Sequence, residues 1–396
     1  MLRVELVYFN AGGGHRTAAE ALAAMAAIEG RPWLVRLTHL FEELDPTRRF
    51  QAWTGMVPEA YYNARLARGW TMGLERELKL LQAGIRWLHP QVVQRLQQHW
   101  AQSKPDLVIS LVPNFNRAIG ESLSLAAPDV PFMTVLTDLA DFPPRFWIEP
   151  SIKAHIVCGT QRAVAQALDG GCDPTHVHRV SGMILRPAFY EQAALDRVEA
   201  RRELGIDPGA LAGIVMFGGH GSAEMIRVAG LLPDTPLILL CGHNDRLARR
   251  LRAMPSRAPR VIVGFALDVQ RWMRLGDFFV GKPGPGSISE ALQCGLPVVL
   301  TRNRTTMPQE RFNTDWVQHQ GLGLVIQRYS QLPAAVLQLS SQLPAFHRRV
   351  DAHHNNATRE VTQLMAQLLG HAQSASKPFE LVDSVVDRPQ CVTSLT

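Results

Sequence analysis

The sequence lacks the features that mark several common classes of protein. Its five cysteines are scattered and none belongs to a CxxC pair, which disfavours a disulfide scaffold or a cysteine-based zinc site and suits a reducing cytoplasm. No apolar run is long enough to span a bilayer. The first residues form a short apolar stretch that enters a glycine turn without a cleavage-like site, so we expect no signal peptide.

Length and composition instead indicate a globular protein with two domains. The chain has 396 residues, of which 46% are hydrophobic and 19% are charged. That length exceeds one ordinary domain, and that balance is typical of a folded protein.

Short apolar runs alternate with helical stretches, which predicts parallel sheets with helices on both faces. The pattern starts again after about residue 190. We therefore predict an α/β protein of two Rossmann-like domains, at residues 1–190 and 191–350, with a helix at 351–372 that returns to the first domain and a tail at 373–396. The expected strands are 4–9, 33–37, 106–111, 132–137, 154–158, 214–217, 237–241, 261–264, 278–280 and 298–301.

The strongest motif is the glycine-rich run after the fourth strand of the second domain. Gly284 and Gly286 let the backbone approach a phosphate closely, and the helix that starts here offers free N–H groups. Ser287 can cap this helix or bond a phosphate oxygen, and Glu290 can accept hydrogen bonds from two ribose hydroxyls. A tight turn with an N-cap residue is the alternative. Because Lys282 precedes the glycines, this is not a Walker loop.

A second polar group follows at Gln309, Glu310 and Asn313. Amide and carboxylate groups suit sugar hydroxyls, which both donate and accept hydrogen bonds. A polar helix start is the alternative.

Two polar residues follow expected strands of the first domain. His15 comes after a glycine run that is not GxGxxG, and Asp138 follows the strand at 132–137. Both should lie at the carboxyl edge of the sheet, where ligands bind. An imidazole there can act as a general base, and the carboxylate can orient an acceptor hydroxyl or stabilise a charged imidazole. The alternatives are a surface histidine and a turn cap.

Positive charge is concentrated in one segment. Between Arg48 and Lys104 there are nine basic and three acidic residues, an excess equal to the net charge of +6 of the whole chain. Aromatic side chains are interleaved with them, a pattern that suits an anionic membrane surface or a nucleic acid. The residues expected to form an acceptor or membrane surface here are Trp53, Arg65, Arg68 and Trp70.

The order and spacing of these motifs resemble the monogalactosyldiacylglycerol synthase family and its processive diacylglycerol glucosyltransferase relatives, cousins of the bacterial lipid-II N-acetylglucosaminyltransferase. The resemblance runs from about residue 4 to 325. It rests on Gly12–Arg16 followed by Ala18–Ala21, Thr137–Leu139 with Pro144 and Trp147, Gly182 with Arg186, Pro187 and Phe189, Gly218–Ser222, Gly242–Asn244, Lys282–Glu290 and Gln309–Asn313.

The resemblance implies a GT-B fold, whose two domains face each other across a cleft, with the acceptor in the first and a UDP-sugar in the second. His15 matches the proposed catalytic base and Asp138 a functional aspartate, with Gly13 and Gly14 beside them in the acceptor site. The expected nucleotide-sugar site comprises Gly218, Gly219, Ser222, Gly242, Asn244, Phe265 (near uracil), Lys282, Gly284, Gly286, Ser287, Glu290, Gln309, Glu310 and Asn313.

The sequence also departs from the family pattern. Pro283 stands where alanine is usual, Arg311-Phe312 replaces a small pair beside the sugar site, and the run Val112–Asn116 lacks a histidine often found before its proline. These departures leave the hexose and the acceptor open.

We therefore predict an inverting, metal-independent glycosyltransferase that moves galactose or glucose from a UDP-sugar to a membrane lipid such as diacylglycerol. No cofactor, metal site or nucleic-acid partner is expected. The enzyme would be cytoplasmic and peripheral on the inner face of the cell membrane, bound to its anionic surface. Two alternatives stay open: a UDP-sugar 2-epimerase-like enzyme on the same scaffold, and a non-catalytic nucleotide- or nucleic-acid-binding protein.

Overall fold

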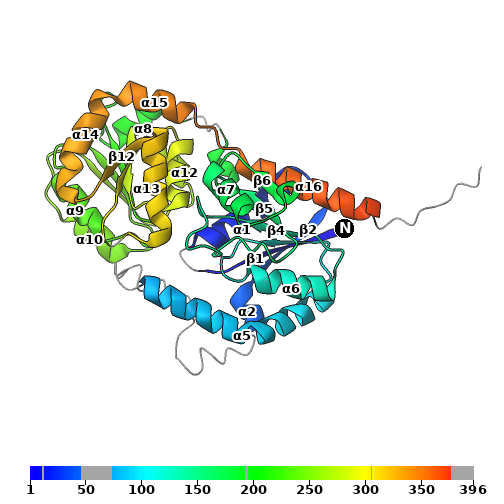
Figure 1. Cartoon of the computed structure of the whole chain (residues 1–396). Coiled ribbons are helices and arrows are strands. Elements are labelled where there is room, and N and C mark those ends of the chain that lie inside the picture. The colour runs from blue at the N-terminus through cyan, green and yellow to red at the C-terminus, as the bar shows by residue number, and fades with distance from the viewer. Residues whose placement is uncertain (11–12, 46–73, 192–194, 305, 376–396) are drawn as a thin grey trace, which may run out of the picture.

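The computed structural model describes residues 1–10, 13–45, 74–191, 195–304 and 306–375. It contains two six-stranded sheets, each flanked by helices, which form two neighbouring lobes (Figure 1). Every strand pair in both sheets is parallel. The two Rossmann-like sheets predicted from the sequence are thereby confirmed.

The first sheet has the strand order β2-β1-β3-β4-β5-β6. Leu6 and Val7 are both fully buried and belong to separate apolar clusters, because successive side chains of β1 point to opposite faces that helices cover. The elements of this lobe are β1 (Leu2–Tyr8), α1 (Gly14–Ile28), β2 (Trp33–His39), α2 (Leu40–Leu44), α5 (Leu74–Ser103), β3 (Leu107–Ser110), α6 (Asn116–Ala126), β4 (Phe132–Val135), β5 (His155–Cys158), α7 (Gln161–Asp169), η1 (Pro174–His176), β6 (Val177–Arg179) and η2 (Pro187–Phe189).

The second sheet has the order β12-β11-β10-β7-β8-β9. Its neighbours Phe278 and Phe279 are fully buried and again lie in different clusters, so this sheet too is covered on both faces. Its elements are α8 (Arg197–Glu203), β7 (Gly213–Met216), α9 (Glu224–Leu231), β8 (Leu237–Leu240), α10 (Asp245–Arg252), β9 (Arg260–Val263), α11 (Val269–Met273), β10 (Phe278–Gly281), α12 (Pro285–Gln293), β11 (Val298–Thr301), α13 (Pro308–Gln320), β12 (Gly323–Ile326), η3 (Tyr329–Gln331), α14 (Leu332–Ser341) and α15 (Leu343–Asp351).

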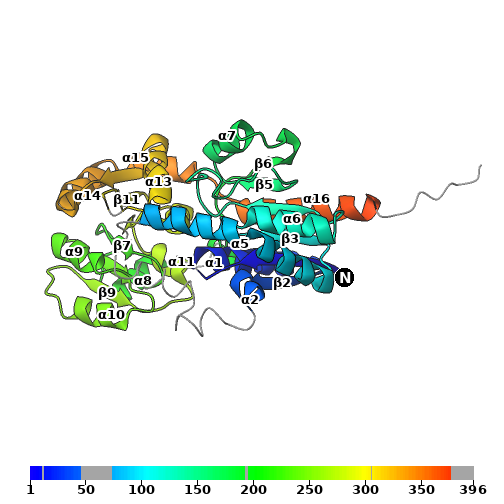
Figure 2. The same cartoon turned by 60° about the horizontal axis from the view of Figure 1, so that its bottom comes forward.

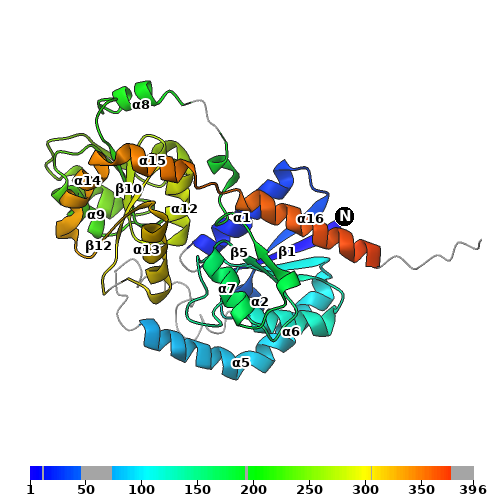
Figure 3. The same ribbon diagram turned by 45° about the horizontal axis from the view of Figure 1, so that its top comes forward.

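The chain crosses between the lobes twice, and we call the two crossings, residues 181–190 and 351–358, the hinge. The hydroxyl of Thr358 donates to the carbonyl of Leu185 at 2.8 Å, and the Asn355 amide donates to the carbonyl of Met183 at 2.9 Å. After the hinge, α16 (Ala357–Ala375) lies against α1 and shares an apolar cluster with β1 (Figure 3). The last described helix therefore completes the first lobe.

The long helix α5 runs along the first lobe, and its N-terminal end points toward the second lobe (Figures 1 and 2). A buried ionic group fixes its far end, because His99 contacts Glu5 of β1 at 2.8 Å and Glu43 of α2 at 2.9 Å. Of the aromatic residues interleaved with the basic ones in this segment, Trp100 is a core residue, whereas Trp87 is 78% exposed. The sequence pattern alone did not separate these two tryptophans.

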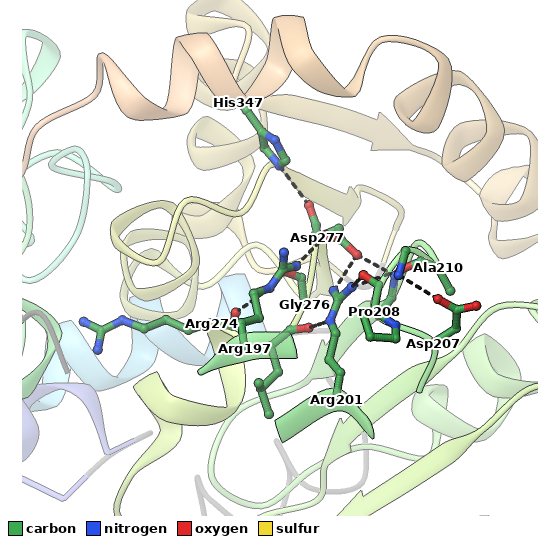
Figure 4. A network of polar contacts seen from close by, with 12 residues as sticks. Arg197, Arg201, Asp207, Pro208, Ala210, Arg274, Gly276, Asp277 and His347 are labelled. Atoms are coloured by element: carbon green, nitrogen blue, oxygen red, sulfur yellow. Dashed lines mark hydrogen bonds and ion pairs between the residues drawn. The ribbon is translucent and has the colours of Figure 1, made fainter. Parts of the chain in front are cut away.

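A second buried ionic group anchors α8 to the second sheet (Figure 4). The guanidinium of Arg201 is almost fully buried and donates to Asp277 at 2.7 Å and to the carbonyl of Leu275 at 2.9 Å. The same carboxylate accepts the N–H of Ala212 at 2.7 Å, so charge and hydrogen bonds are satisfied together. This arrangement fixes the start of the second lobe.

Among the described residues, no helix is both long and apolar enough to cross a membrane.

Candidate active site

The first lobe places His15 in the first turn of α1. Gly13, at the N-cap, has a φ of 79°, a left-handed conformation that glycine adopts without strain. The Nδ1 atom of His15 lies 3.1 Å from the hydroxyl of Thr137, and its ring packs 4.6 Å from that of Phe9 between centroids. Burial lowers the pKa of His15 to about 4, against a hydrogen bond with the Leu111 backbone that raises it. The imidazole is therefore neutral at pH 7 and able to accept a proton.

Asp138 follows β4 at the same edge of the sheet. Its carboxylate accepts the indole N–H of Trp147 at 2.9 Å, and the Trp147 ring also lies 5.8 Å from that of His15. Burial raises the pKa of Asp138 to about 6; Glu310 of the second lobe also raises it, and Lys282 lowers it. Trp147 thus contacts both predicted catalytic residues, whereas His15 Nδ1 lies within hydrogen-bond distance of Thr137.

The position of Trp147 is itself fixed by buried polar groups that sequence reasoning missed. Trp147 is fully buried, its backbone N–H donates to Asp141 at 2.7 Å, and its carbonyl accepts the amide of Asn116 at 2.8 Å. Asn116 also accepts the hydroxyl of Ser110 at 2.5 Å. The backbone of Trp147 is therefore held on both sides, which fixes the indole that bonds to Asp138.

In the second lobe, two glycine loops pack together at the ends of β7 and β8. Gly218 and Gly242 have φ of 81° and 58°. The N–H of His243 donates to the carbonyl of Gly219 at 2.9 Å, and a Cβ on Gly242 would lie 2.0 Å from that same carbonyl oxygen. Only glycine fits at 242, because both its backbone conformation and its neighbour exclude a side chain.

Gly242→Ala should destabilise the fold by about 2–5 kcal/mol, the combined cost of left-handed strain and steric overlap. Gly219→Ala is the matched control, since a Cβ there meets no atom within 4 Å. Urea denaturation of both variants measures the difference. Equal midpoints would show that the two loops move apart easily.

The glycine turn after β10 starts α12, but not as the sequence predicted. Gly284 is the N-cap and Pro285 the first helical residue, so Ser287 lies inside the first turn and is not the cap. Proline is favoured at the first helical position because it needs no N–H partner there. The N–H of Ile288 bonds to Gly284 at 3.1 Å, which leaves the N–H groups of Gly286 and Ser287 at the open end of the helix.

Glu290 lies one turn further along α12 and is half-buried. Burial raises the pKa of its carboxyl to about 7, and the nearby Arg186 lowers it. Arg186 comes from the hinge and donates to the carbonyl of Leu267 at 2.8 Å. The hinge therefore places a cation beside the predicted ribose ligand, an arrangement that joins residues about a hundred positions apart.

The predicted sugar-binding residues of α13 meet the end of β10. Lys282 and Glu310 form an ion pair at 2.9 Å, and the buried Asn313 donates to the carbonyl of Pro283 at 2.8 Å. The Gln309 amide lies 3.6 Å from the sulfur of Met307. Because Lys282 and Glu310 also act on the pKa of Asp138, the two lobes present their charged groups to one shared region.

Three other predicted donor residues have local partners. Asn244 caps α10 by accepting the N–H of Leu247 at 2.9 Å, and the hydroxyl of Ser222 accepts the N–H of Glu224 at 3.3 Å. Phe265 is 57% exposed and stacks on His243 at 3.9 Å between centroids, which makes an open aromatic platform after β9.

The remaining predicted residues include two glycines at the start of α1. Gly14 is the first residue of that helix and is exposed, as is Gly13. Within the described ranges, no group of three or more His, Cys, Asp or Glu side chains is arranged to hold a metal ion. The predicted acceptor or membrane residues that lie outside the described residues are Trp53, Arg65, Arg68 and Trp70.

Comparison with curated proteins identifies relatives over most of the chain. A probable monogalactosyldiacylglycerol synthase 2, chloroplastic, from Oryza sativa subsp. indica is 30% identical over 345 residues, which cover 81% of this chain and 70% of the relative. Monogalactosyldiacylglycerol synthase 3 of Arabidopsis thaliana is 28% identical, with the same coverage. The spinach enzyme is 27% identical over 380 residues, which cover 88% and 70%. No protein-family model matches the chain.

Solved structures with the same fold are glycosyltransferases and a related enzyme. MurG of Acinetobacter baumannii aligns with a TM-score of 0.59 at 13% identity, over 93% of this chain and all of that one. The calicheamicin glycosyltransferase CalG4 gives 0.60 at 14% identity, over 94% and 99%. A putative UDP-N-acetylglucosamine 2-epimerase from Listeria monocytogenes gives 0.54 at 14%, over 94% and 97%, so the fold alone does not separate transferase from epimerase.

The predicted GT-B fold is confirmed by these structures, and the alignment with the rice relative covers 81% of this chain. The chain belongs to the monogalactosyldiacylglycerol synthase family and is a glycosyltransferase.

Proposed function

We propose that this enzyme transfers galactose or glucose from a UDP-sugar to a hydroxyl group of a membrane lipid such as diacylglycerol, with inversion at the anomeric carbon. The observation that carries the proposal is the meeting of the two lobes, where Lys282 and Glu310 act on the carboxyl of Asp138 beside His15. The names of the plant relatives support a lipid acceptor, and a structural neighbour, HepE from Anabaena, was solved with UDP.

In this mechanism the hydroxyl oxygen of the lipid forms a bond to the anomeric carbon as the bond from that carbon to the diphosphate oxygen breaks, and UDP leaves with its electron pair. His15 accepts the hydroxyl proton as the new bond forms. A single displacement of this kind inverts the anomeric configuration. The low pKa of His15 keeps its imidazole in the neutral form that can accept a proton at pH 7 and makes it a weak base, so the proton is transferred together with bond formation and not before it.

The leaving diphosphate would be stabilised by the chain itself. The N–H groups of Gly286 and Ser287 lie at the positive end of α12, and the ammonium of Lys282, paired with Glu310, lies beside Gly284. We therefore propose that transfer proceeds without a metal ion, so that added EDTA leaves the rate unchanged.

The test uses purified protein with radiolabelled UDP-galactose or UDP-glucose and diacylglycerol in mixed micelles, followed by thin-layer chromatography. A labelled glycolipid, formed equally with EDTA present, is expected. A parallel incubation with UDP-N-acetylglucosamine and no lipid detects a 2-epimer. Epimer formation without any glycolipid would replace the proposal with the epimerase alternative.

We further propose that the enzyme is cytoplasmic and attaches to the inner face of the cell membrane through the segment Arg48–Lys104. Its charge excess supports this, as does the exposure of Trp87 and Leu88 on α5. Each basic residue near an anionic surface contributes about 1 kcal/mol, and salt screens the attraction.

Replacing Arg65, Arg68 and Arg76 by Ser should therefore release the protein from anionic vesicles in a flotation assay. The matched control replaces three exposed arginines of α10, Arg246, Arg249 and Arg250, by Ser. If both triple variants float equally with the wild type, or if wild type binds neutral and anionic vesicles alike, the basic segment is not the anchor.

A further inference from the structure

A pocket of about 410 Å³ lies at the hinge, apart from the site described above. It sits where the chain passes from α15 to α16, on the opposite side of the molecule from α5 (Figures 1 and 3). The lining residues that matter here are Tyr190, Gly295, Asp351, His353, His354 and Arg359.

Basic groups outnumber acidic ones in this lining. His353, His354 and Arg359 stand against the single carboxylate of Asp351. The guanidinium of Arg359 is exposed and lies over the Tyr190 ring, 5.8 Å from its centroid. Burial lowers the pKa of His353, and Arg179 and His354 lower it further, so this imidazole is neutral near pH 7 and can donate a ring N–H.

One helix of the predicted donor site, α12, lines the pocket, and the second, α13, packs against the lining residue His353. The helix α12 carries Gly286 at its first turn and ends at Gln293, which lines the pocket. The ring of His353 packs edge-on against Trp316 of α13 at 5.3 Å between centroids. Because α13 also carries Glu310, a molecule held in the pocket would contact α12 directly and α13 through His353.

We propose that the hinge pocket binds a small soluble phosphate compound and that its occupancy fixes α12 and α13 relative to the hinge. The guanidinium of Arg359 is suited to charge-assisted hydrogen bonds with phosphate oxygens, the imidazoles can add N–H donors, and the volume fits a small molecule. The phosphate belongs to a soluble molecule and not to a lipid headgroup, because the pocket lies opposite the proposed membrane face. An effect of occupancy on hexose transfer rests on the proposed function; binding does not.

The test is calorimetric titration of glycerol 3-phosphate, and separately of inorganic phosphate, into the full chain saturated with UDP so that the donor site is closed. Saturable binding of either probe is expected, weakened by about tenfold or more in the double variant His354→Gln, Arg359→Gln. The control is Arg348→Gln, an exposed arginine of α15 outside the pocket. Thermal melting shows whether the variants remain folded.

The proposal is overturned if neither probe binds the wild type, or if the double variant binds as the wild type does. It is also overturned if only vesicles of an anionic phospholipid distinguish the two proteins. Because binding is measured without hexose transfer, a protein that transfers no hexose can still pass this test. Transfer rates with and without the bound probe then report the coupling separately.

Discussion

His15→Ala should lower the turnover of hexose transfer by about a hundredfold or more, the usual contribution of a positioned general base. The affinity for UDP should stay within about twofold of the wild type, because His15 belongs to the first lobe and the predicted UDP ligands belong to the second. The position supports this, since the imidazole is neutral at pH 7, held by Thr137, and packed beside Trp147.

The measurement combines initial rates with saturating donor and acceptor and a calorimetric titration of UDP. His319→Ala, which alters an exposed histidine at the end of α13, serves as the control and should leave both quantities unchanged. Near-wild-type turnover in His15→Ala would make His15 a loop residue. A parallel loss of UDP binding would show that the substitution disturbs the fold and not only the proton transfer.

The two-sheet architecture could be predicted because its strands are short, apolar and buried on both faces. Leu6 and Val7 on β1, like Phe278 and Phe279 on β10, show no exposed surface, so both faces of each strand are buried. The apolar run of β1 is interrupted only by the exposed Arg3 and the buried Glu5. The edge strand β6 (Val177–Arg179) was missed, since it has three residues, two of them polar, and none is buried. The missed strand β12 is likewise an edge strand, beginning with glycine.

Local geometry at the donor loop was harder to predict than the presence of the loop. Ser287 was predicted as an N-cap because serine is common at that position, but Pro285 starts the helix two residues earlier. Asn244 was predicted to touch the donor, and its side chain caps α10 instead of standing free. Serine and asparagine side chains can cap a helix or bind a ligand through the same polar atoms, so the sequence alone does not show which role they have.

Contacts between distant segments account for the rest of what was missed. The bond from Trp147 to Asp138 spans nine residues, and the approach of Arg186 to Glu290 joins the hinge to α12. Neither has a periodic signal, because the first depends on the path of a loop and the second on how the hinge meets the second lobe. Burial raises the pKa of both carboxyls, and Trp147 lowers that of Asp138 while Arg186 lowers that of Glu290.

Glu290→Ala should weaken UDP binding by about tenfold to a hundredfold, since each hydrogen bond to a charged group is worth roughly 1.5–3 kcal/mol. The expectation rests on the place of Glu290, one turn beyond the open N–H groups of α12 and beside Arg186. Glu290→Gln keeps the shape but removes the charge, and should lie between the alanine variant and the wild type. Unchanged UDP affinity in the alanine variant would remove the ribose role.

The pKa of Glu290 is raised to about 7 in the empty site, so a change of pH near neutrality can test whether its negative charge contributes to UDP binding. If the ionised carboxylate accepts the ribose hydroxyls, affinity follows its ionised fraction and should rise about tenfold from pH 6 to pH 8. UDP-glucose is the better probe, because its diphosphate diester does not titrate in that interval. In the ligand-free enzyme, the stability of the fold changes with pH in the opposite direction. Because the pKa of Glu290 is higher in the folded chain than in the unfolded chain, this carboxyl contributes to stability below its unfolded pKa, and the contribution is lost as pH rises through 7.

Calorimetric titrations of UDP-glucose at several pH values, with wild type and Glu290→Gln, measure the effect. The wild-type affinity should rise with pH and level off above about pH 8, whereas the glutamine variant should give one affinity throughout. The glutamine variant should also gain stability over the wild type above pH 7 when no ligand is present, because it leaves no buried charge there. A pH dependence that persists in Glu290→Gln would instead assign it to another group, of which Asp138, with a pKa of about 6, is the nearest candidate in the cleft.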